Sequence, residues 1–187
     1  MSDSFDRSIE LTRGGRANET RRRRFETHCA PFAADLFRFV LWMCRDRTLA
    51  EDVVQETLLR AWRSIDSLKD PEAARPWLLR IARRELSRVF ERKRLPTVKL
   101  DTAVESGDDA LTVSESHEVH DMRRAILNLD VLYREPLTMQ VLLGFTAEEI
   151  AQQLQISVPT VLTRLFRARA LLRKQLGGAL DDGDECG

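Results

Sequence analysis

The stretch from residue 146 to residue 172, TAEEIAQQLQISVPTVLTRLFRARALL, contains two short helical patterns separated by a tripeptide. Thr146 and Glu149 stand three residues apart, so each side chain can accept a hydrogen bond from the backbone N–H of the other in a capping box. A helix is therefore expected to begin there. The break falls at the tripeptide QIS, where Ser157 can cap a second helix and Pro159 lies in its first turn, the position at which a missing N–H is harmless. The stretch therefore predicts a helix-turn-helix.

Each of the two helices has an apolar and a polar side. The first should bury one face and leave the other in solvent, with Ile150, Ala151 and Leu154 inward and Glu148, Gln152 and Gln153 outward. The second repeats apolar residues at intervals of four, three and four, at Val161, Leu165, Ala168 and Leu172. Its outward side carries hydroxyls and guanidiniums that can reach base edges and phosphates in a major groove, on Thr160, Thr163, Arg164 and Arg167. The alternative is an ordinary helix pair in a bundle with a solvated basic face.

The charged residues are unevenly distributed along a chain whose net charge is zero. Residues 60–94 hold eleven Lys and Arg against five Asp and Glu, and residues 122–176 hold eight against four. Between them, residues 95–120 hold one lysine against six acidic residues. Any affinity for nucleic acid must therefore come from this distribution rather than from an overall basic balance. The length of 187 residues allows one domain or two small ones.

The cysteine pattern and the hydropathy argue for a cytoplasmic protein. Cys29, Cys44 and Cys186 are odd in number and widely spaced, which is typical of reduced thiols. No apolar run approaches the length of a membrane span, and the first residues lack the apolar segment of a signal peptide, so we expect no membrane insertion. A metal or redox site would have to use these cysteines with His28, His117 and His120, whose spacing fits no standard zinc site. We expect neither a metal nor a cofactor.

Helical periodicity dominates the first half of the chain. Residues 1–24 are polar and end in four consecutive arginines, which predicts a flexible basic arm that either contacts DNA phosphates or is a disordered leader. Residues 25–44 are rich in apolar residues and should form core, with Pro31 near a helix start. The next helical pattern runs to Ile65 and is followed by a loop in which Pro71 suits the first turn of a long basic helix that ends at Arg94.

The second half begins with an acidic segment, 95–121, that lacks helical periodicity and predicts a flexible linker between two domains. Periodicity returns over 122–176, with one or two helices before the helix-turn-helix and Pro136 at the start or at a bend of one of them. Residues 177–187 read as a disordered tail. The predicted fold is therefore all-α, with two small helical domains joined by an acidic flexible linker and a helix-turn-helix in the C-terminal one.

Two motif sets in this chain resemble one protein family. The first set consists of the segment AEDVVQETLLRAW (50–62) and a W-L-x-x-I-A-R helix (77–83) with a basic end. The second set follows an acidic linker and runs from Tyr133 to Arg173. Together they resemble the bacterial sigma factors of the extracytoplasmic-function group. The resemblance covers about residues 25 to 176, and it is specific because both sets occur in the expected order and separation. It implies region 2 over 25–94 and region 4 over 122–176.

The resemblance implies a transcription initiation factor that binds core RNA polymerase, directs it to specific promoter DNA and assists promoter opening. It also implies control by an anti-sigma factor, and it implies neither enzymatic activity nor a small-molecule substrate. The alternative is a stand-alone helix-turn-helix regulator, which would leave the segment 50–62 without a role. A binding assay with and without core polymerase separates the two.

The resemblance assigns the polymerase-binding helix to the segment 50–62. One side of that helix carries a mixed acidic and apolar strip that suits a basic coiled coil, with Asp52, Gln55, Glu56, Leu59 and, one turn further, Arg63. The alternative is an exposed helix face without a partner. The other side carries the apolar residues Val54, Leu58, Ala61, Trp62 and Ile65, and we expect Trp62 and Trp77 to belong to the core.

The resemblance assigns the minus-ten reader to the loop SLKDPE (67–72) and the basic helix after it. Such an element must capture a base that has left the stack, while cationic side chains hold the strand. The candidates for backbone contacts are Lys69, Arg80, Arg84 and Arg88, each of which could instead be a solvated charge. The minus-thirty-five reader corresponds to the helix-turn-helix, with Thr160, Thr163, Arg164 and Arg167 reading base edges or only positioning the helix on phosphates.

Four positions depart from the family's pattern. Many relatives carry asparagine where Arg84 stands and an acidic residue near Arg88, and Leu162 occupies a position that is often lysine. Asp130 stands where proline is common. The resemblance therefore does not carry over a promoter sequence.

Overall fold

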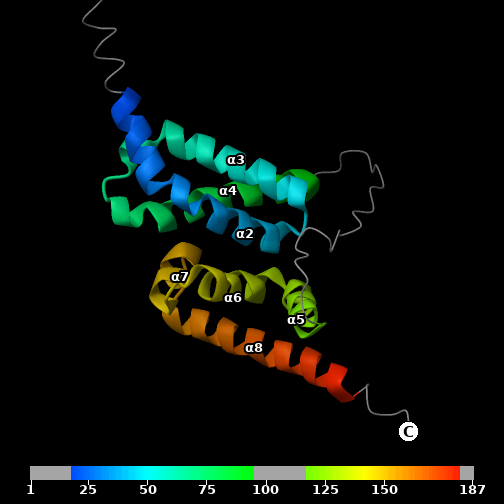
Figure 1. The fold of residues 1–187 in the computed structure, drawn as a ribbon. Coiled ribbons are helices and arrows are strands. Elements are labelled where there is room, and N and C mark those ends of the chain that lie inside the picture. Colours follow the sequence, from blue (N-terminus) through cyan, green and yellow to red (C-terminus); the bar gives the residue numbers. More distant parts are fainter. Residues whose placement is uncertain (1–17, 95–116, 182–187) are drawn as a thin grey trace, which may run out of the picture.

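The computed structural model describes residues 18–94 and 117–181, and every regular element in these ranges is a helix. The first domain has a helix over residues 18–28, followed by η1 (Ala30–Phe32), α2 (Ala33–Cys44), α3 (Arg47–Arg63), η2 (Ile65–Ser67), η3 (Pro71–Ala73) and α4 (Ala74–Arg94). The second domain has α5 (His117–Asn128), α6 (Val131–Leu143), α7 (Ala147–Leu154) and α8 (Val158–Asp181). Figure 1 shows the two domains stacked, with α2 on the side that faces α6. The all-α, two-domain prediction is confirmed.

Local signals in the sequence set the helix boundaries of the first domain. Arg45 adopts a left-handed conformation (φ 60°) that ends α2, and the Asp46 carboxylate accepts the Leu49 N–H at 3.0 Å to begin α3. Pro71 lies at the start of η3, which leads directly into α4, as the sequence predicts. The three long helices pack around a common core that includes Phe39, Val40, Val53, Ala61, Ile65, Leu78, Leu79 and Ala82. Trp62 and Trp77 are half-buried against this core.

The second domain is a helix-turn-helix, α7 and α8, supported by α5 and α6. Both halves of the predicted capping box are present, since Glu149 N–H donates to Thr146 Oγ1 at 3.2 Å and Thr146 N–H donates to Glu149 Oε2 at 2.8 Å. Ser157 caps α8 through the Thr160 N–H at 3.3 Å. The predicted inward stripe of α8 is buried along its whole length, at Val161, Leu165, Ala168 and Leu172.

Side chains from both domains meet at the interface between α2 and α4 on one side and α6 and α7 on the other. Two hydrogen bonds cross the interface, from Arg134 Nη2 to the Met43 carbonyl at 3.1 Å and from Gln153 Nε2 to the Pro76 carbonyl at 3.0 Å. An ion pair joins Arg83 Nε to Glu135 Oε1 at 2.7 Å. The Arg75 guanidinium lies 5.2 Å from the centre of the Phe145 ring. Arg83 also donates to the Gln153 carbonyl. Hydrogen bonds and ion pairs therefore hold the two domains in direct contact.

The structure corrects several sequence predictions at the ends of elements. Residues 18–24 are helical rather than part of a flexible arm, and residues 117–121 belong to α5 rather than to a linker. The tail was predicted to begin at 177, but α8 continues to Asp181. Residues 1–17, 95–116 and 182–187 lie outside the described residues. Pro136 lies inside α6, where its missing N–H leaves the Leu132 carbonyl without its usual helical donor.

The predicted solvent position of Gln153 is also wrong, because this side chain is buried at the domain interface. Its amide donates to a carbonyl of the other domain, and this hydrogen bond satisfies the buried polar group. The helical pattern of α7 gives no information about a partner in another domain.

Candidate nucleic-acid and protein interfaces

The outer side of α3 presents the strip that the sequence assigns to a protein partner. Asp52, Gln55 and Arg63 are exposed, and Leu59 is 49% exposed although it is apolar. Glu56 differs from the others because it is half-buried and its Oε1 lies 2.8 Å from Arg60 Nε. The structure therefore brings all five predicted residues to one helix, where Asp52 and Glu56 also line the groove toward α4 and Glu56 is paired with Arg60.

A groove of about 1050 Å³ separates this strip from α4. An ion-pair network lies along it, in which Glu85 Oε1 lies 2.9 Å from Arg60 Nε and 3.0 Å from Arg88 Nη1. The Glu85 side chain is 7% exposed, so two arginines share one buried carboxylate between α3 and α4. Glu85 is not among the residues predicted from the sequence, although its spacing from Leu78 and Ala82 places it on the buried stripe of the helix.

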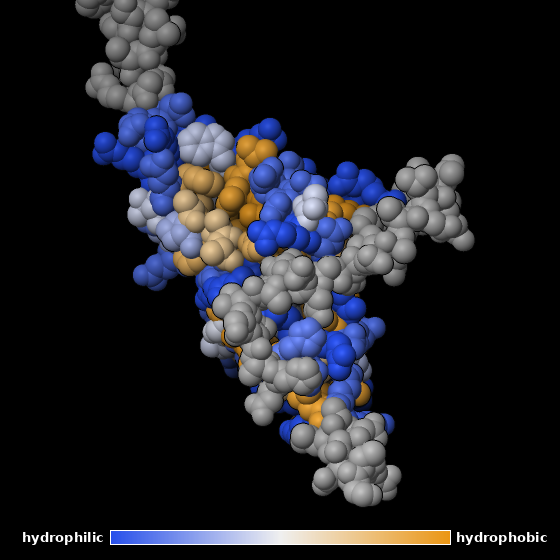
Figure 2. Space-filling view, turned by 45° about the vertical axis from the view of Figure 1, so that its right-hand side comes forward, coloured by the Kyte–Doolittle hydropathy of each residue, from blue (hydrophilic) through white to orange (hydrophobic). Residues whose placement is uncertain are grey.

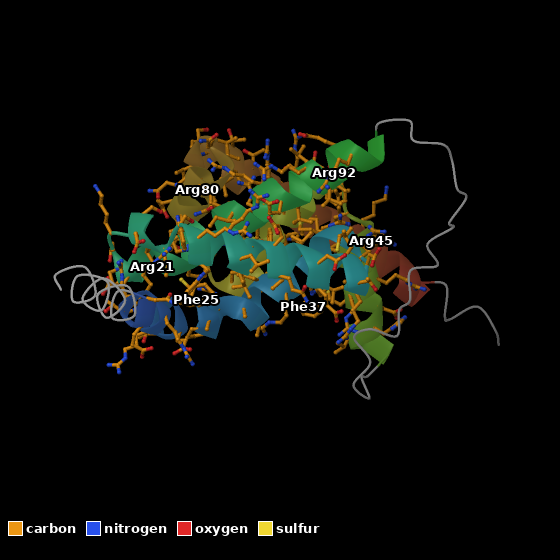
Figure 3. All side chains as sticks on the ribbon, turned by 90° about the horizontal axis from the view of Figure 1, so that it is seen from above. Arg21, Phe25, Phe37, Arg45, Arg80 and Arg92 are labelled. Carbon is orange, nitrogen blue, oxygen red and sulfur yellow. The ribbon has the colours of Figure 1, made fainter. Side chains whose placement is uncertain are left out.

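The basic residues of α4 form an exposed row. Arg80, Arg84 and Arg88 recur every four residues and are all exposed, and Figure 3 shows Arg80 on the edge of α4 that lies away from α2. Arg88 is already paired with Glu85, whereas Lys69 is exposed in the segment that precedes η3. Neighbouring Arg83 points instead toward the second domain and pairs with Glu135. The row can therefore hold a phosphate backbone, with Arg88 as the member that has a competing intramolecular partner.

The four candidate residues of the helix-turn-helix line one hollow. Thr160, Thr163, Arg164 and Arg167 surround a pocket of about 300 Å³ together with Pro159, Leu132 and Tyr133. The threonine hydroxyls already have local partners, since Thr163 Oγ1 donates to the Pro159 carbonyl at 2.8 Å and Thr160 Oγ1 lies 2.8 Å from Ser157 Oγ. The guanidiniums are thus the groups best able to reach a ligand.

An apolar pair on α8 adjoins this basic side, and the sequence patterns assign it no role. Phe166 is 66% exposed and Leu162 is 54% exposed, one helical turn apart. A second apolar patch, bordered by hydrophilic residues, lies on the first domain in the view of Figure 2. Exposed apolar surface of this kind is typical of protein-binding sites.

The cysteines and histidines do not converge within the described residues. Cys29 is fully buried, and burial raises the pKa of its thiol against the opposing effect of Arg24. Cys44 Sγ donates to the Asp46 carbonyl at 3.2 Å. In the ranges 18–94 and 117–181 no group of three or more His, Cys, Asp or Glu residues could hold a metal ion. Cys186 lies outside these ranges. Among the described residues, no helical segment combines the length and the apolar character that a membrane span requires.

Comparison with known families and proteins gives matches over both domains. The models for Sigma-70 region 2 and Sigma-70 region 4 match residues 30–95 and 120–172. The chain is 30% identical over 152 residues to the ECF RNA polymerase sigma factor SigM of Bacillus subtilis, a match that covers 79% of this chain and 92% of that protein. It is 34% identical over 153 residues to the ECF RNA polymerase sigma factor SigL of Mycobacterium tuberculosis, covering 77% and 84% of the two proteins.

Two solved structures share the fold of this chain. The sigma factor RpoE of Bartonella quintana, in complex with the anti-sigma factor NepR, superposes with a TM-score of 0.66 at 24% identity, covering 82% of this chain and 96% of that one. CnrH, in complex with the cytosolic domain of CnrY, superposes with a TM-score of 0.61 at 26% identity, covering 91% and 96%. From the relatives and the two family models together, the chain belongs to the extracytoplasmic-function (ECF) sigma factors of RNA polymerase.

Proposed function

We propose that this chain binds core RNA polymerase through the outer strip of α3, reads the minus-ten element with α4 and the segment before it, and reads the minus-thirty-five element with α8. The observation that carries the proposal is the presence in one chain of an exposed strip on α3, an exposed arginine row on α4 and a helix-turn-helix whose candidate residues line one pocket. A stand-alone regulator has no use for the first two. In this assignment region 2 includes the helix over 18–28, and region 4 begins with α5.

The residue roles follow from exposure and charge. Asp52, Gln55 and Leu59 contact a basic coiled coil of the polymerase, because they combine negative charge with accessible apolar surface. Arg80 and Arg84 contact the backbone of the opened strand, and Lys69 contributes from the preceding segment. Arg164 and Arg167 contact the minus-thirty-five duplex, with Thr160 and Thr163 beside them.

An anti-sigma factor is the third partner in this proposal. The sigma factor RpoE, a protein of similar fold, has been solved with the anti-sigma factor NepR, and CnrH, also of similar fold, has been solved with the cytosolic domain of CnrY. On this chain the exposed Leu162 and Phe166 of α8 give such a partner an apolar footing beside the DNA-binding side. We assign the chain to the cytoplasm, where polymerase and promoter are found, and we assign it no catalytic activity, cofactor or small-molecule substrate.

Run-off transcription tests the proposal. Purified core polymerase and a fragmented genomic template of the source organism are combined with the wild-type chain or with an Asp52→Arg, Gln55→Arg variant. Both positions are exposed, and the ion pairs of Glu85 are made with Arg60 and Arg88, so the variant should fold. A Glu148→Arg, Gln152→Arg variant on α7 is the matched control, because it adds the same positive charge at exposed positions of the other domain.

The expected result is transcription from discrete start sites with the wild type and the control, and its loss with the α3 variant. The opposite result is an absence of polymerase-dependent transcripts together with sequence-specific DNA binding by the chain alone. That outcome would favour the stand-alone regulator.

A further inference from the structure

The four consecutive arginines, 21–24, lie on the helix over residues 18–28 and divide into two pairs. Arg22 and Arg23 are exposed and pair along the same helix, with Glu26 at 2.8 Å and with Glu19 at 3.1 Å. Arg21 and Arg24 are half-buried and point into the first domain. The helical spacing of three residues explains this division, because it places positions 21 and 24 on one face.

The Arg21 side chain meets the C-terminal end of α3. Its Nη2 donates to the carbonyls of Trp62 at 3.2 Å and Arg63 at 3.3 Å, and its Nε lies 3.1 Å from Asp66 Oδ2. The last carbonyls of a helix have no partner within the helix and carry partial negative charge, so a guanidinium there satisfies them and is electrostatically favourable.

The Arg24 side chain meets the segment that joins α3 to α4. Its Nη2 donates to the Leu68 carbonyl at 2.7 Å, and its Nη1 lies 3.8 Å from Asp66 Oδ1. Leu68 is buried and is followed directly by Lys69 and Asp70, which are exposed. The hydrogen bond therefore fixes the backbone next to the residues that the proposed function assigns to the minus-ten reader.

Aromatic packing adds a third attachment. The Phe25 ring meets the Trp62 ring edge-on, with centroids 5.6 Å apart and an angle of 85° between the rings, and the Arg21 guanidinium lies 5.7 Å from the Trp62 ring centre. Figure 3 shows Arg21 and Phe25 together at one end of the domain, opposite Arg45 and Arg92. The N-terminal helix thus contacts both the end of α3 and the joining segment.

We propose that Arg21 and Arg24 are positioning residues for minus-ten recognition, which hold residues 64–70 in the conformation that admits an unstacked base. The inference rests on the proposed function, because it assumes that this segment forms the base pocket. The segment's own hydrogen bonds are local, such as Ser67 N–H to the Ser64 carbonyl at 2.9 Å and Leu68 N–H to the Ile65 carbonyl at 3.1 Å. The long-range hydrogen bonds and ion pairs that join this segment to other described residues come from the two arginines.

Discrimination between bases depends on a pocket that is already shaped before the base enters. A pocket held in one conformation admits the right base and leaves the wrong one with unpaired polar groups, whereas a mobile pocket adapts to both. Removal of the two arginines should therefore lower the preference among minus-ten sequences more than it lowers total transcription.

The other reading of an arginine run is direct contact with DNA phosphates. In that case the exposed pair, Arg22 and Arg23, should matter more than the half-buried pair. The two hypotheses therefore predict opposite rankings of two variants that remove the same charge from the same helix.

The test uses the full chain with core polymerase on a promoter library randomised over the minus-ten element, with the minus-thirty-five element fixed. The ratio of transcripts from preferred to disfavoured sequences is compared for the wild type, Arg21→Gln with Arg24→Gln, and Arg22→Gln with Arg23→Gln. We expect the first variant to lose about tenfold in this ratio, and the second to keep it. Arg24→Lys, which retains a donor for the Leu68 carbonyl, should recover part of it.

Asp66→Asn provides a second variant that removes both ion pairs without changing the helix, and it should shift the ratio in the same direction. The melting temperature of each variant shows whether its folding is impaired. A folding defect lowers all transcripts equally, so it does not change the ratio that reports recognition. An unchanged ratio in the Arg21 and Arg24 variant, or an equal loss in the Arg22 and Arg23 variant, would overturn the positioning role alone. A wild-type chain without polymerase-dependent transcripts would overturn the proposed function and this inference with it.

Discussion

At the scale of single residues, Cys29 shows what burial does to a potentially reactive group. Its side chain is fully buried between the N-terminal helix and η1, and burial raises the pKa of the thiol. Because the thiolate is the reactive form, a raised pKa and a buried sulfur both slow alkylation and oxidation. A sensing role for Cys29 is therefore disfavoured by its surroundings.

We expect iodoacetamide to modify Cys29 slowly in the native chain and rapidly in urea, as measured by mass spectrometry of the labelled peptides. In the native chain the alkylation rate of Cys29 should continue to rise with pH above about 8.5, where the alkylation rate of an ordinary thiol begins to level off. The fold favours the protonated thiol, so stability should fall as pH rises past the unfolded pKa. Equal labelling rates in buffer and in urea would contradict this account.

Arg134 is a buried cation that both domains share. It donates to the carbonyls of Leu127 at 2.6 Å and Leu129 at 3.4 Å, and to the Met43 carbonyl of the other domain at 3.1 Å. Burial, with a contribution from Arg45, lowers its pKa to about 10, so it stays protonated at neutral pH. The carbonyls lie near the C-terminal ends of α2 and α5, where helix dipoles favour a positive charge.

Substitution Arg134→Met should lower the free energy of unfolding by about 2–3 kcal/mol, because it leaves several buried carbonyls without a donor. Urea unfolding followed by circular dichroism measures the change. Arg173→Met, at an exposed position of α8, is the control and should change stability by about 0.5 kcal/mol or less. Similar losses in the two variants would show that the carbonyl contacts contribute little.

At the scale of elements, the network in the groove joins α3 to α4. Glu85 is the only carboxylate among the described residues that lies within 4.0 Å of both Arg60 and Arg88. Through Arg60 the network extends to Glu56, on the strip assigned to polymerase, and through Arg88 it reaches the row assigned to DNA. The same charges therefore stabilise the helix pair and border both proposed interfaces.

Glu85→Gln should destabilise the chain by about 2 kcal/mol, between the values typical of exposed and of fully buried ion pairs, since two arginines lose their common counter-charge. Thermal unfolding measures the effect. Glu91→Gln, which removes a charge from an exposed position lining the same groove, should be nearly neutral. If both variants melt at the wild-type temperature, the network does not hold α3 to α4.

Sequence patterns predicted the elements whose determinants are local. The capping box of Thr146 and Glu149, the cap at Ser157 and the buried stripe of α8 all depend on residues within one or two turns. Gln153 was not predicted as buried because its partner, the Pro76 carbonyl, lies in another element at a sequence separation that periodicity does not register. The spacing of Glu85 does place it on the buried stripe of α4, but its ion pair with Arg60 of α3 cannot be read from the periodicity of one helix. The helix over residues 18–28 was missed for a similar reason, since its stabilising contacts with Trp62 and Leu68 come from distant parts of the chain.

At the scale of the whole molecule, the proposed minus-ten helix is in contact with the helix-turn-helix. Arg83, between Arg80 and Arg84 on α4, bonds to α6 through Glu135 and to α7 through the Gln153 carbonyl. On a promoter the two elements are separated by roughly 25 base pairs, or about 85 Å at 3.4 Å each. This arrangement cannot serve both readers at once, so we expect the domains to separate when polymerase and promoter bind.

Weakening the contact should therefore strengthen binding to core polymerase, because less free energy is needed to separate the domains. We expect Arg83→Ala with Glu135→Ala to raise the affinity for core polymerase by about fivefold, the factor that corresponds to a coupling near 1 kcal/mol. Fluorescence titration without DNA measures it. Arg84→Ala, an exposed neighbour on α4, is the control and should leave this affinity unchanged. An unchanged or weaker affinity in the double variant would show that the contact does not oppose polymerase binding.

The helix over residues 18–28 also affects which part of this chain would have to be transplanted together with region 2 into another sigma factor. The family match to region 2 begins at residue 30, yet Arg21, Arg24 and Phe25 contact the end of α3 and the segment after it from outside that boundary. A chimera that transplanted residues 30–95 alone into another sigma factor would therefore lose these supports for the transplanted reader. If the proposed function holds, the unit that determines promoter choice in this chain is longer than the family domain and includes the arginine run that precedes it.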